Sequence, residues 1–129
     1  MKRREGFTLV ELLIVVGIIG ILVSISIPIF TAQMHKAKVA ADWANLRAYY
    51  AEIQADYMST QKQNPKVKVI DVAGSDYDWQ SVTFLDGHKV KMKAGYCAVR
   101  FKKDKGYSIA YDCNKSHEKC KLGLGENYD

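Results

Sequence analysis

The stretch that decides the fold is the N-terminal sequence MKRREGFTLVELLIVVGIIGILVSISIP, residues 1–28. Its start is basic, and from Leu12 to Phe30 the chain carries no charge. One carboxylate, that of Glu11, stands at the start of this apolar run. A charged side chain near the centre of a bilayer costs about 2.5–3.5 kcal/mol on insertion scales. A carboxylate kept there needs a partner, and we expect none for Glu11 within its own helix.

Three interpretations of this segment compete. A secretory signal peptide has an apolar core of about 7–15 residues and a small-residue cleavage site. The apolar run here is longer than that. The small residue Ala32 does not complete a cleavage site, because bulky Phe30 stands two positions before it. A plain membrane anchor needs about 20 apolar residues, and the basic residues 2–4 would keep its N-terminus cytoplasmic. A subunit that is first processed and then packs against copies of itself also explains Glu11.

The pattern around Glu11 is specific. The residues GFTLVE at positions 6–11, followed by the apolar run, resemble the N-terminus of type IV prepilins and type II secretion pseudopilins. The resemblance implies that a membrane peptidase cuts after Gly6 and that the new N-terminal residue, Phe7, is N-methylated. It also identifies Glu11 as the assembly glutamate of the family.

Two further residues of the segment match the family. Gly20 and Pro28 correspond to a glycine and a proline that bound a helix segment which unwinds in assembled filaments. The partners implied are other copies of the chain in a helical filament, the prepilin peptidase, an assembly platform and, before assembly, membrane lipid. The implied location is the cytoplasmic membrane for a single-pass precursor and then an extracellular pilus.

Cleavage would give Glu11 a partner. A cut after Gly6 creates a positive amine at Phe7, four residues from the carboxylate. In a filament whose subunits are displaced along the axis, the amine of one subunit can meet the Glu11 carboxylate of its neighbour. An opposite charge at close range offsets the desolvation cost and sets the axial register.

Periodicity predicts one long helix from about residue 7 to residue 61. Beyond Pro28 its apolar residues recur at spacings of three and four, which indicates one buried stripe. The stripe consists of Val39, Trp43, Leu46, Tyr50, Ile53 and Tyr57. We expect three parts in the chain: a leader at 1–6, a transmembrane and filament-core half-helix at 7–30, and a soluble domain at 31–129 that includes the amphipathic half of the helix.

Four strands are predicted after the helix. Residues 81–85 and 89–93 flank the turn Asp86-Gly87-His88, in a register that pairs Val82 with Met92. Residues 96–103 and 107–113 flank a second turn at 104–106, where Gly106 suits the left-handed position. The fold class is therefore α+β, a long N-terminal helix packed on a small antiparallel sheet, as the pilin resemblance also implies.

The three cysteines leave several possibilities open. The second hairpin's register places Cys97 opposite Cys113, near disulfide reach, and this pair is our first choice. A Cys113–Cys120 bridge is the alternative, and it resembles the disulfide-closed C-terminal region of many pilins, where the loop is usually larger. A zinc set of Cys97, Cys113, His117 and Cys120 has feasible spacing, but it lacks the paired CxxC pattern of a strong site.

Charge is unevenly distributed in a chain of 129 residues with a formal net charge of +5. Ten Lys or Arg and three acids lie between His88 and Lys121. This basic region suggests DNA as a further partner, a surface for acidic neighbours or, most simply, a solvated face. Two carboxylates at 74–78 resemble the start of a calcium loop, but no ligand frame follows.

No signature of an enzyme is present, since there is no phosphate loop, HExxH motif or nucleophile–base pair. We expect neither catalysis nor a cofactor. The leading hypothesis is a subunit of a type IV pilus that serves adhesion, twitching motility or DNA uptake. The alternatives are a pseudopilin of a secretion or competence system, and a single-pass membrane protein with a basic nucleic-acid-binding domain.

Overall fold

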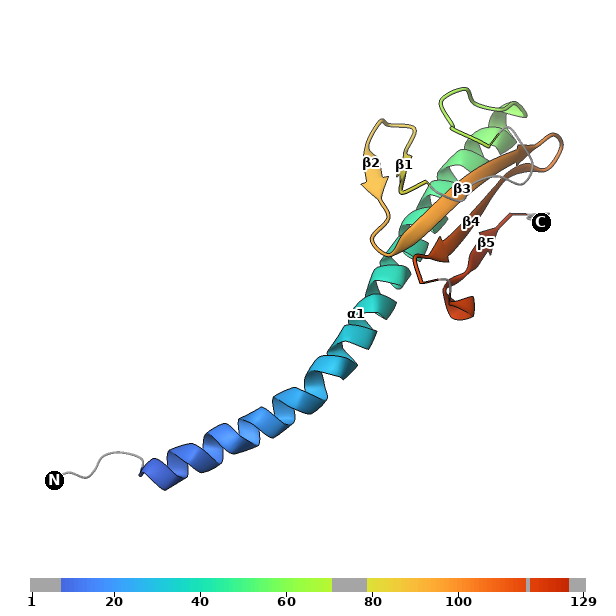
Figure 1. Cartoon of the computed structure of the whole chain (residues 1–129). Coiled ribbons are helices and arrows are strands. Elements are labelled where there is room, and N and C mark those ends of the chain that lie inside the picture. The colour runs from blue at the N-terminus through green and yellow to red at the C-terminus, as the bar shows by residue number, and fades with distance from the viewer. Residues whose placement is uncertain (1–7, 71–78, 116, 126–129) are drawn as a thin grey trace. The chain divides into compact units, whose positions relative to one another are not determined.

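The computed structural model describes residues 8–70, 79–115 and 117–125. The chain divides into two compact units, Met1–Lys36 and Ala37–Asp129. Helix α1 (Leu9–Thr60) contributes to both units, and the strands all belong to the second. Figure 1 shows the elements in chain order. The carboxylates at 74–78, which resemble the start of a calcium loop, lie outside the described residues.

Helix α1 begins and ends close to the predicted positions. Its 52 residues include Pro28, and the helix continues through it. At the C-terminal end Gln61 adopts a positive φ of 58° and its N–H donates to the Tyr57 carbonyl at 2.7 Å. A left-handed residue is a common way for a helix to end. Pro65 follows four residues later, and because proline has no backbone N–H to donate it disfavours a continuation of the helix.

The buried face of α1 differs from the predicted stripe. The buried residues are Val39, Asp42, Leu46, Tyr49, Ile53 and Tyr57. Trp43 and Tyr50, which were predicted in the stripe, are half-buried and pack against the core. The face is rotated because a carboxylate, Asp42, occupies a core position that hydropathy assigns to solvent. The side chain of Asp42 is completely buried, with 0% of its surface exposed.

Five strands form two antiparallel sheets. Strands β1 (Ser81–Thr83) and β2 (Lys89–Lys91) pair with each other. Strands β3 (Gly95–Lys102), β4 (Gly106–Cys113) and β5 (Leu122–Leu124) form the second sheet in that order, with the 3-10 turn η1 (Glu118–Cys120) before β5. The α+β class is confirmed, and β5 is a strand that the sequence did not predict.

Both hairpins have registers two residues away from those predicted. Val82 pairs with Val90 and not with Met92. In the second hairpin Cys97 pairs with Tyr111, whereas Cys113 pairs with Gly95. A slip of two residues keeps every side chain on its predicted face because the strand period is two. The apolar faces were therefore right and the cross-strand partners wrong, which removes the geometric reason for a Cys97–Cys113 disulfide.

Gly106 occupies the position that its turn requires. Its φ is +90°, which favours glycine. A Cβ atom built there would lie 2.5 Å from Oε1 of Gln54. That amide group binds the hairpin directly, since the Tyr107 N–H donates to Gln54 Oε1 at 2.9 Å. The turn and the helix therefore meet without room for a side chain between them.

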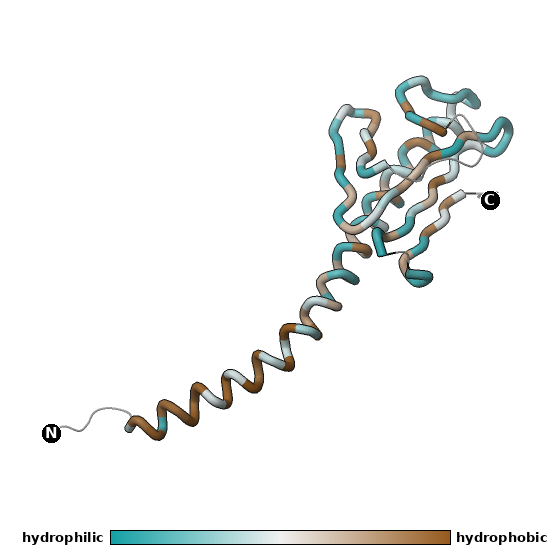
Figure 2. Tube along the Cα trace, in the orientation of Figure 1, coloured by the Kyte–Doolittle hydropathy of each residue, from teal (hydrophilic) through white to brown (hydrophobic). Residues whose placement is uncertain are grey.

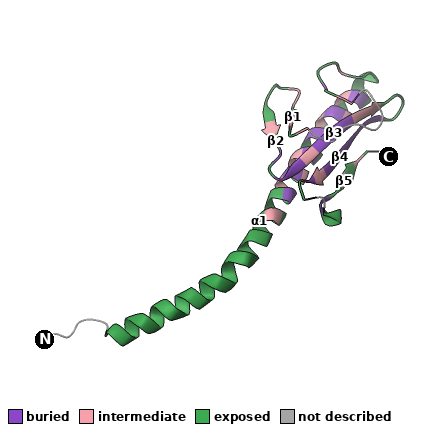
Figure 3. Ribbon diagram, in the orientation of Figure 1, coloured by how far each residue is buried: buried purple, intermediate pink, exposed green. Residues whose placement is uncertain are grey.

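Aromatic rings fill the interface between helix and strands in the second unit. Tyr57 makes edge-on contacts with Phe101 and Tyr107, with ring centroids 5.5 and 6.3 Å apart. Tyr49 meets Phe84 in the same manner at 5.2 Å. Such pairs contribute about 0.5–1.5 kcal/mol beyond the area they bury. Figure 3 shows the buried residues gathered where the helix faces the three-stranded sheet.

Asp42 joins the helix to the strands by hydrogen bonds. Its carboxylate accepts the N–H of Lys93 at 2.7 Å and of Ala94 at 2.8 Å, and the Tyr111 hydroxyl at 2.7 Å. Burial, and then this hydrogen bond, raise the pKa of Tyr111. A buried carboxylate is tolerated when several donors replace its water shell. Asp42 therefore positions the connection between β2 and β3.

The Asp42 network predicts a graded loss of stability. Asp42→Ala leaves three donors without their acceptor, and each unsatisfied buried group costs about 1–3 kcal/mol. We expect the free energy of unfolding of the full chain in detergent to fall by about 3 kcal/mol or more. Tyr111→Phe removes one donor and should cost about 1 kcal/mol. Urea unfolding followed by near-UV circular dichroism measures both.

The matched control is Lys38→Ala, an exposed substitution on the same helix. Equal unfolding midpoints for Asp42→Ala and Lys38→Ala would contradict a structural role for the buried carboxylate.

Candidate functional site: an uncovered apolar helix

The first turn of α1 carries a reciprocal pair of hydrogen bonds. The Thr8 N–H donates to the Glu11 carboxylate at 3.3 Å, and the Glu11 N–H donates to the Thr8 hydroxyl at 3.2 Å. The Leu12 N–H closes the first helical bond to the Thr8 carbonyl at 3.1 Å. This is a capping box, in which side chains satisfy N–H groups that the helix leaves unpaired. The expectation that Glu11 has no partner within its own helix was wrong.

The capping box leaves the charge of Glu11 unneutralised. Thr8 offers a neutral N–H, whereas the cost of moving a carboxylate out of water is set mostly by its charge. A carboxylate also has about four lone-pair sites, so one bond to Thr8 leaves capacity for a further donor. The negative side chain at a helix N-terminus is favoured by the helix dipole. Glu11 is thus oriented within the subunit and still able to bind a cation.

The N-terminal half of α1, as far as Phe30, exposes all of its large apolar side chains. From Leu9 to Phe30 each Leu, Ile, Val and Phe is between 45% and 74% exposed. Figure 2 shows this part of α1 as an almost continuous hydrophobic tube, and Figure 3 shows it as exposed. By length and composition α1 is able to cross a membrane. Apolar surface of this extent requires lipid or protein to cover it.

Polar groups within this segment are bonded to the helix itself. The hydroxyls of Ser24, Ser26 and Thr31 donate to the carbonyls of residues 21, 22 and 27 at 2.7, 2.8 and 3.0 Å. In lipid such groups have no water to bind, so internal bonds lower the cost of insertion. Hydroxyl bonds of this kind also weaken and bend helices slightly.

Gly20 and Pro28 both lie inside α1. Nothing lies within 4 Å of a Cβ built at Gly20, so this glycine is not required by close packing in the single subunit. Glycine costs a helix about 1 kcal/mol relative to alanine, and proline removes one backbone hydrogen bond. The stretch between them is therefore the weakest part of the helix. Gly6 and Phe7, the predicted cleavage and methylation residues, lie outside the described residues.

The three cysteines are buried, and the described structure forms no disulfide between them. Cys97 lies on β3, and the Trp79 carbonyl accepts its N–H at 2.9 Å. Burial, and then the Asp42 carboxylate, raise the pKa of the Cys97 thiol to about 12. Such a thiol remains protonated and unreactive at neutral pH.

Cys113 and Cys120 lie together at the opposite end of the strand pair from the β3–β4 turn. Cys113 ends β4 and Cys120 ends η1, and His117 stands just before that turn. Burial raises the pKa of Cys113, but hydrogen bonds from Cys120 and from the N–H groups of His117 and Lys115 bring it below its ordinary value. Of the predicted zinc set, the described structure brings together three members and places Cys97 elsewhere.

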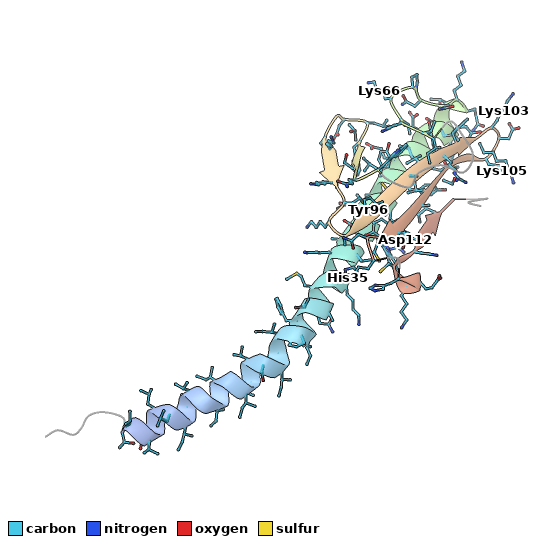
Figure 4. The ribbon with its side chains drawn as sticks, viewed as in Figure 1. His35, Lys66, Tyr96, Lys103, Lys105 and Asp112 are labelled. Atoms are coloured by element: carbon cyan, nitrogen blue, oxygen red, sulfur yellow. The ribbon has the colours of Figure 1, made fainter. Side chains whose placement is uncertain are left out.

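Lysines surround a small pocket beside β1. The pocket measures about 180 Å³, and its lining includes Lys66, Lys68, Lys89 and Trp79. The Lys68 ammonium lies 4.6 Å from the centre of the Trp79 ring. Lys66 follows the end of α1, while Lys103 and Lys105 project from the β3–β4 turn (Figure 4). Lysines therefore lie both beside this pocket and at the β3–β4 turn.

Two residues important to the site were missed in the sequence. The capping box is visible as the spacing Thr8-x-x-Glu11, which is the usual signature of a helix start. Asp42 could be found from the spacing of Val39, Leu46, Ile53 and Tyr57, because a core face through these residues also passes through position 42.

Comparison with known proteins begins with the N-terminus. A family model described as "Prokaryotic N-terminal methylation motif" matches residues 1–27. This match covers the basic start of the chain, Glu11 and most of the apolar segment. No solved structure matches the chain at a significant level.

Curated relatives extend the similarity into the second unit. A type IV major pilin protein of Myxococcus xanthus is 35% identical over 101 residues, which are 76% of this chain and 42% of that protein. A type IV narrow pilus major component of Thermus thermophilus is 52% identical over 52 residues, which are 38% of this chain and 45% of the relative. The aligned region thus spans less than half the length of these relatives. With the methylation motif, these similarities support a relation of the chain to the type IV pilins.

Proposed function

We propose that this protein is a structural subunit of a type IV pilus, processed after Gly6 and assembled through α1. The observation that carries the proposal is the exposed apolar segment Leu9–Phe30 with a single carboxylate at its start. Membrane lipid covers this segment in the precursor, and neighbouring α1 helices cover it in the filament. The pilin names of the relatives support the same function.

The proposed assembly contact joins two subunits. After cleavage the Phe7 amine of one subunit pairs with the Glu11 carboxylate of its neighbour in a nearly dry core. The Thr8 bond supports this contact because it holds the carboxylate at the very start of the helix. A desolvated pair is strongly disfavoured when one member is missing, at about 3–5 kcal/mol. Misplaced subunits would leave both charges unpaired, and this penalty selects one axial register.

The segment between Gly20 and Pro28 is proposed to unwind on assembly. It combines a glycine, two serines that bond to helix carbonyls, and a proline. Carbonyls released in this stretch can be satisfied by neighbouring subunits within a packed filament. Unwinding lengthens the helix and allows the bundle of apolar segments to adjust to the spacing that the Glu11 pair sets.

The further partners follow from the same proposal. A prepilin peptidase removes residues 1–6, and an assembly platform in the cytoplasmic membrane extracts the mature subunit into an extracellular filament. A pseudopilin of a secretion or competence system shares this N-terminal chemistry and is the alternative function. Electron microscopy of material sheared from cells separates the two, since long surface filaments containing this chain support a pilin.

DNA is proposed as a ligand of the pilus on one observation. The pocket beside β1 combines Lys66, Lys68 and Lys89 with the ring of Trp79, and lysines with an aromatic surface suit single-stranded nucleic acid. Replacing the three lysines by alanine should weaken filament binding and reduce the salt slope by about 0.7 per lost contact. The matched control is Lys103→Ala with Lys105→Ala, and an equal loss there would contradict the assignment.

Charge and helix capping at Glu11 can be separated by mutation. Glu11→Gln keeps an oxygen that can accept the Thr8 N–H but removes the charge, so it should abolish filament assembly and leave membrane insertion and leader removal intact. Thr8→Ala removes the cap at a cost of about 1 kcal/mol and keeps the charge. We expect it to assemble. The measurement is the amount of this chain in sheared filaments, relative to the amount in membranes.

The reverse pattern, in which Glu11→Gln assembles and Thr8→Ala does not, would show that Glu11 acts only as a helix cap.

Cleavage is tested by Gly6→Ser. A larger residue before the scissile bond should block the peptidase, and intact mass should show a precursor that retains residues 1–6 and an unmethylated Phe7. Because the amine is then missing, no filament should form. A mature mass in the Gly6→Ser variant would contradict processing at this bond.

A further inference from the structure

The C-terminal end of the sheet holds a compact set of metal-ligating atoms. Cys113 is the last residue of β4, and η1 returns the chain so that Cys120 faces it. The two sulfur atoms and a ring nitrogen of His117 all lie within 4.8 Å of one another. His117 Nδ1 lies 3.7 Å from Cys120 Sγ. The sequence spacing is Cys-x3-His-x2-Cys, which a single tight turn accommodates.

These separations suit a tetrahedral zinc ion. Zinc binds thiolate sulfur at about 2.3 Å and imidazole nitrogen at about 2.0 Å, so neighbouring ligand atoms in a tetrahedron lie roughly 3.5–3.8 Å apart. The distance between His117 and Cys120 already has this value. Small side-chain rotations would bring the remaining atoms, which lie within 4.8 Å, to the same spacing. The backbone does not need to be rebuilt.

The surrounding backbone supports bound thiolates. The His117 N–H donates to Cys113 Sγ at 3.4 Å, and the Lys115 N–H is a second donor to the same sulfur. Hydrogen bonds to ligand sulfurs are the outer-shell support that metal sites require. The Trp43 indole N–H donates to the Cys120 carbonyl at 2.9 Å, which fixes the last turn. Both sulfurs are buried while His117 is exposed, so an ion can enter past the imidazole.

Cys97 provides an internal comparison. It is as buried as the other two, yet it is not among the residues whose ligand atoms gather at this end of the sheet. The clustering is therefore not a general consequence of burying cysteine in this core.

We propose that Cys113, His117 and Cys120 supply three of the ligands of one Zn²⁺ ion. Binding releases two thiol protons, and the metal–sulfur bonds then join η1 and β5 to the end of β4. Two thiolates and one imidazole favour Zn²⁺ over Mg²⁺ or Ca²⁺, which prefer oxygen ligands. In this unit the ion takes the place that a Cys113–Cys120 disulfide would otherwise take.

The test uses the full chain purified in detergent under anaerobic, reducing conditions and titrated with Co²⁺ and then Zn²⁺. We expect sulfur-to-cobalt charge-transfer absorption of two thiolates, tetrahedral visible bands and loss of both on adding one equivalent of Zn²⁺. Cys97→Ser should retain this spectrum. Cys113→Ser and Cys120→Ser should each lose half of the charge-transfer intensity, and His117→Ala should bind at least tenfold more weakly.

Thermal unfolding provides an independent measurement. Zn²⁺ should raise the Tm of wild type and of Cys97→Ser and leave the Tm of a Cys113→Ala, Cys120→Ala double variant unchanged. Far-UV circular dichroism confirms that the double variant is folded. An unchanged cobalt spectrum in that variant, or no thiolate band in wild type, would overturn the proposal. So would a Cys113–Cys120 disulfide in protein whose thiols were alkylated inside the cells before lysis.

Discussion

An apolar helix that its own chain does not cover is the constraint on which the rest of this protein depends. Sixteen large side chains between Leu9 and Phe30 are exposed, and their number and length suit a membrane. At about 25 cal/mol for each Å² buried, covering such a segment is strongly favourable but not directional. It promotes insertion into lipid or packing with other helices, and it does not choose a position along the axis.

In the proposed filament, the position of each subunit along the axis is set by polar groups at the start of the segment. Glu11 is held by Thr8, so its carboxylate has a defined position, and within the described residues no ion pair neutralises its charge. The apolar contact between helices has nearly the same energy at many axial positions. The proposed ion pair with a neighbour's Phe7 amine is favourable only where the two charges meet. The proposed removal of residues 1–6 would create that amine, so in this proposal cleavage is the step between storage in the membrane and assembly.

In the second unit, too, apolar packing supplies most of the buried area and polar groups fix the arrangement. Aromatic and aliphatic side chains supply most of the buried area, while Asp42 and Gln54 bind particular backbone groups of the strands. Apolar packing alone is similarly favourable in several strand registers. The three hydrogen bonds to the buried Asp42 carboxylate can form in only one of these registers. The C-terminal cluster of Cys113, His117 and Cys120 would add a third such constraint near β5.

Much of this could be predicted from the sequence because it depends on local pattern. The span of α1, the α+β class, the strand faces and the positive φ of Gly106 all follow from periodicity and turn chemistry. The cross-strand partners could not be predicted, because registers two residues apart bury the same faces. Asp42 was missed because its burial depends on donors from the β2–β3 connection and from β4. Strand β5 was missed because it is too short to show a pattern.

The central claim is that Glu11 pairs with the amine of another subunit. The most direct measurement is a high-resolution cryo-electron microscopy map of filaments sheared from cells, with the chain identified by mass. The account predicts the N-terminal nitrogen of one Phe7 within about 4 Å of the Glu11 carboxylate of a neighbour, which is the range of an ion pair. A filament in which Glu11 contacts only its own Thr8 would contradict it.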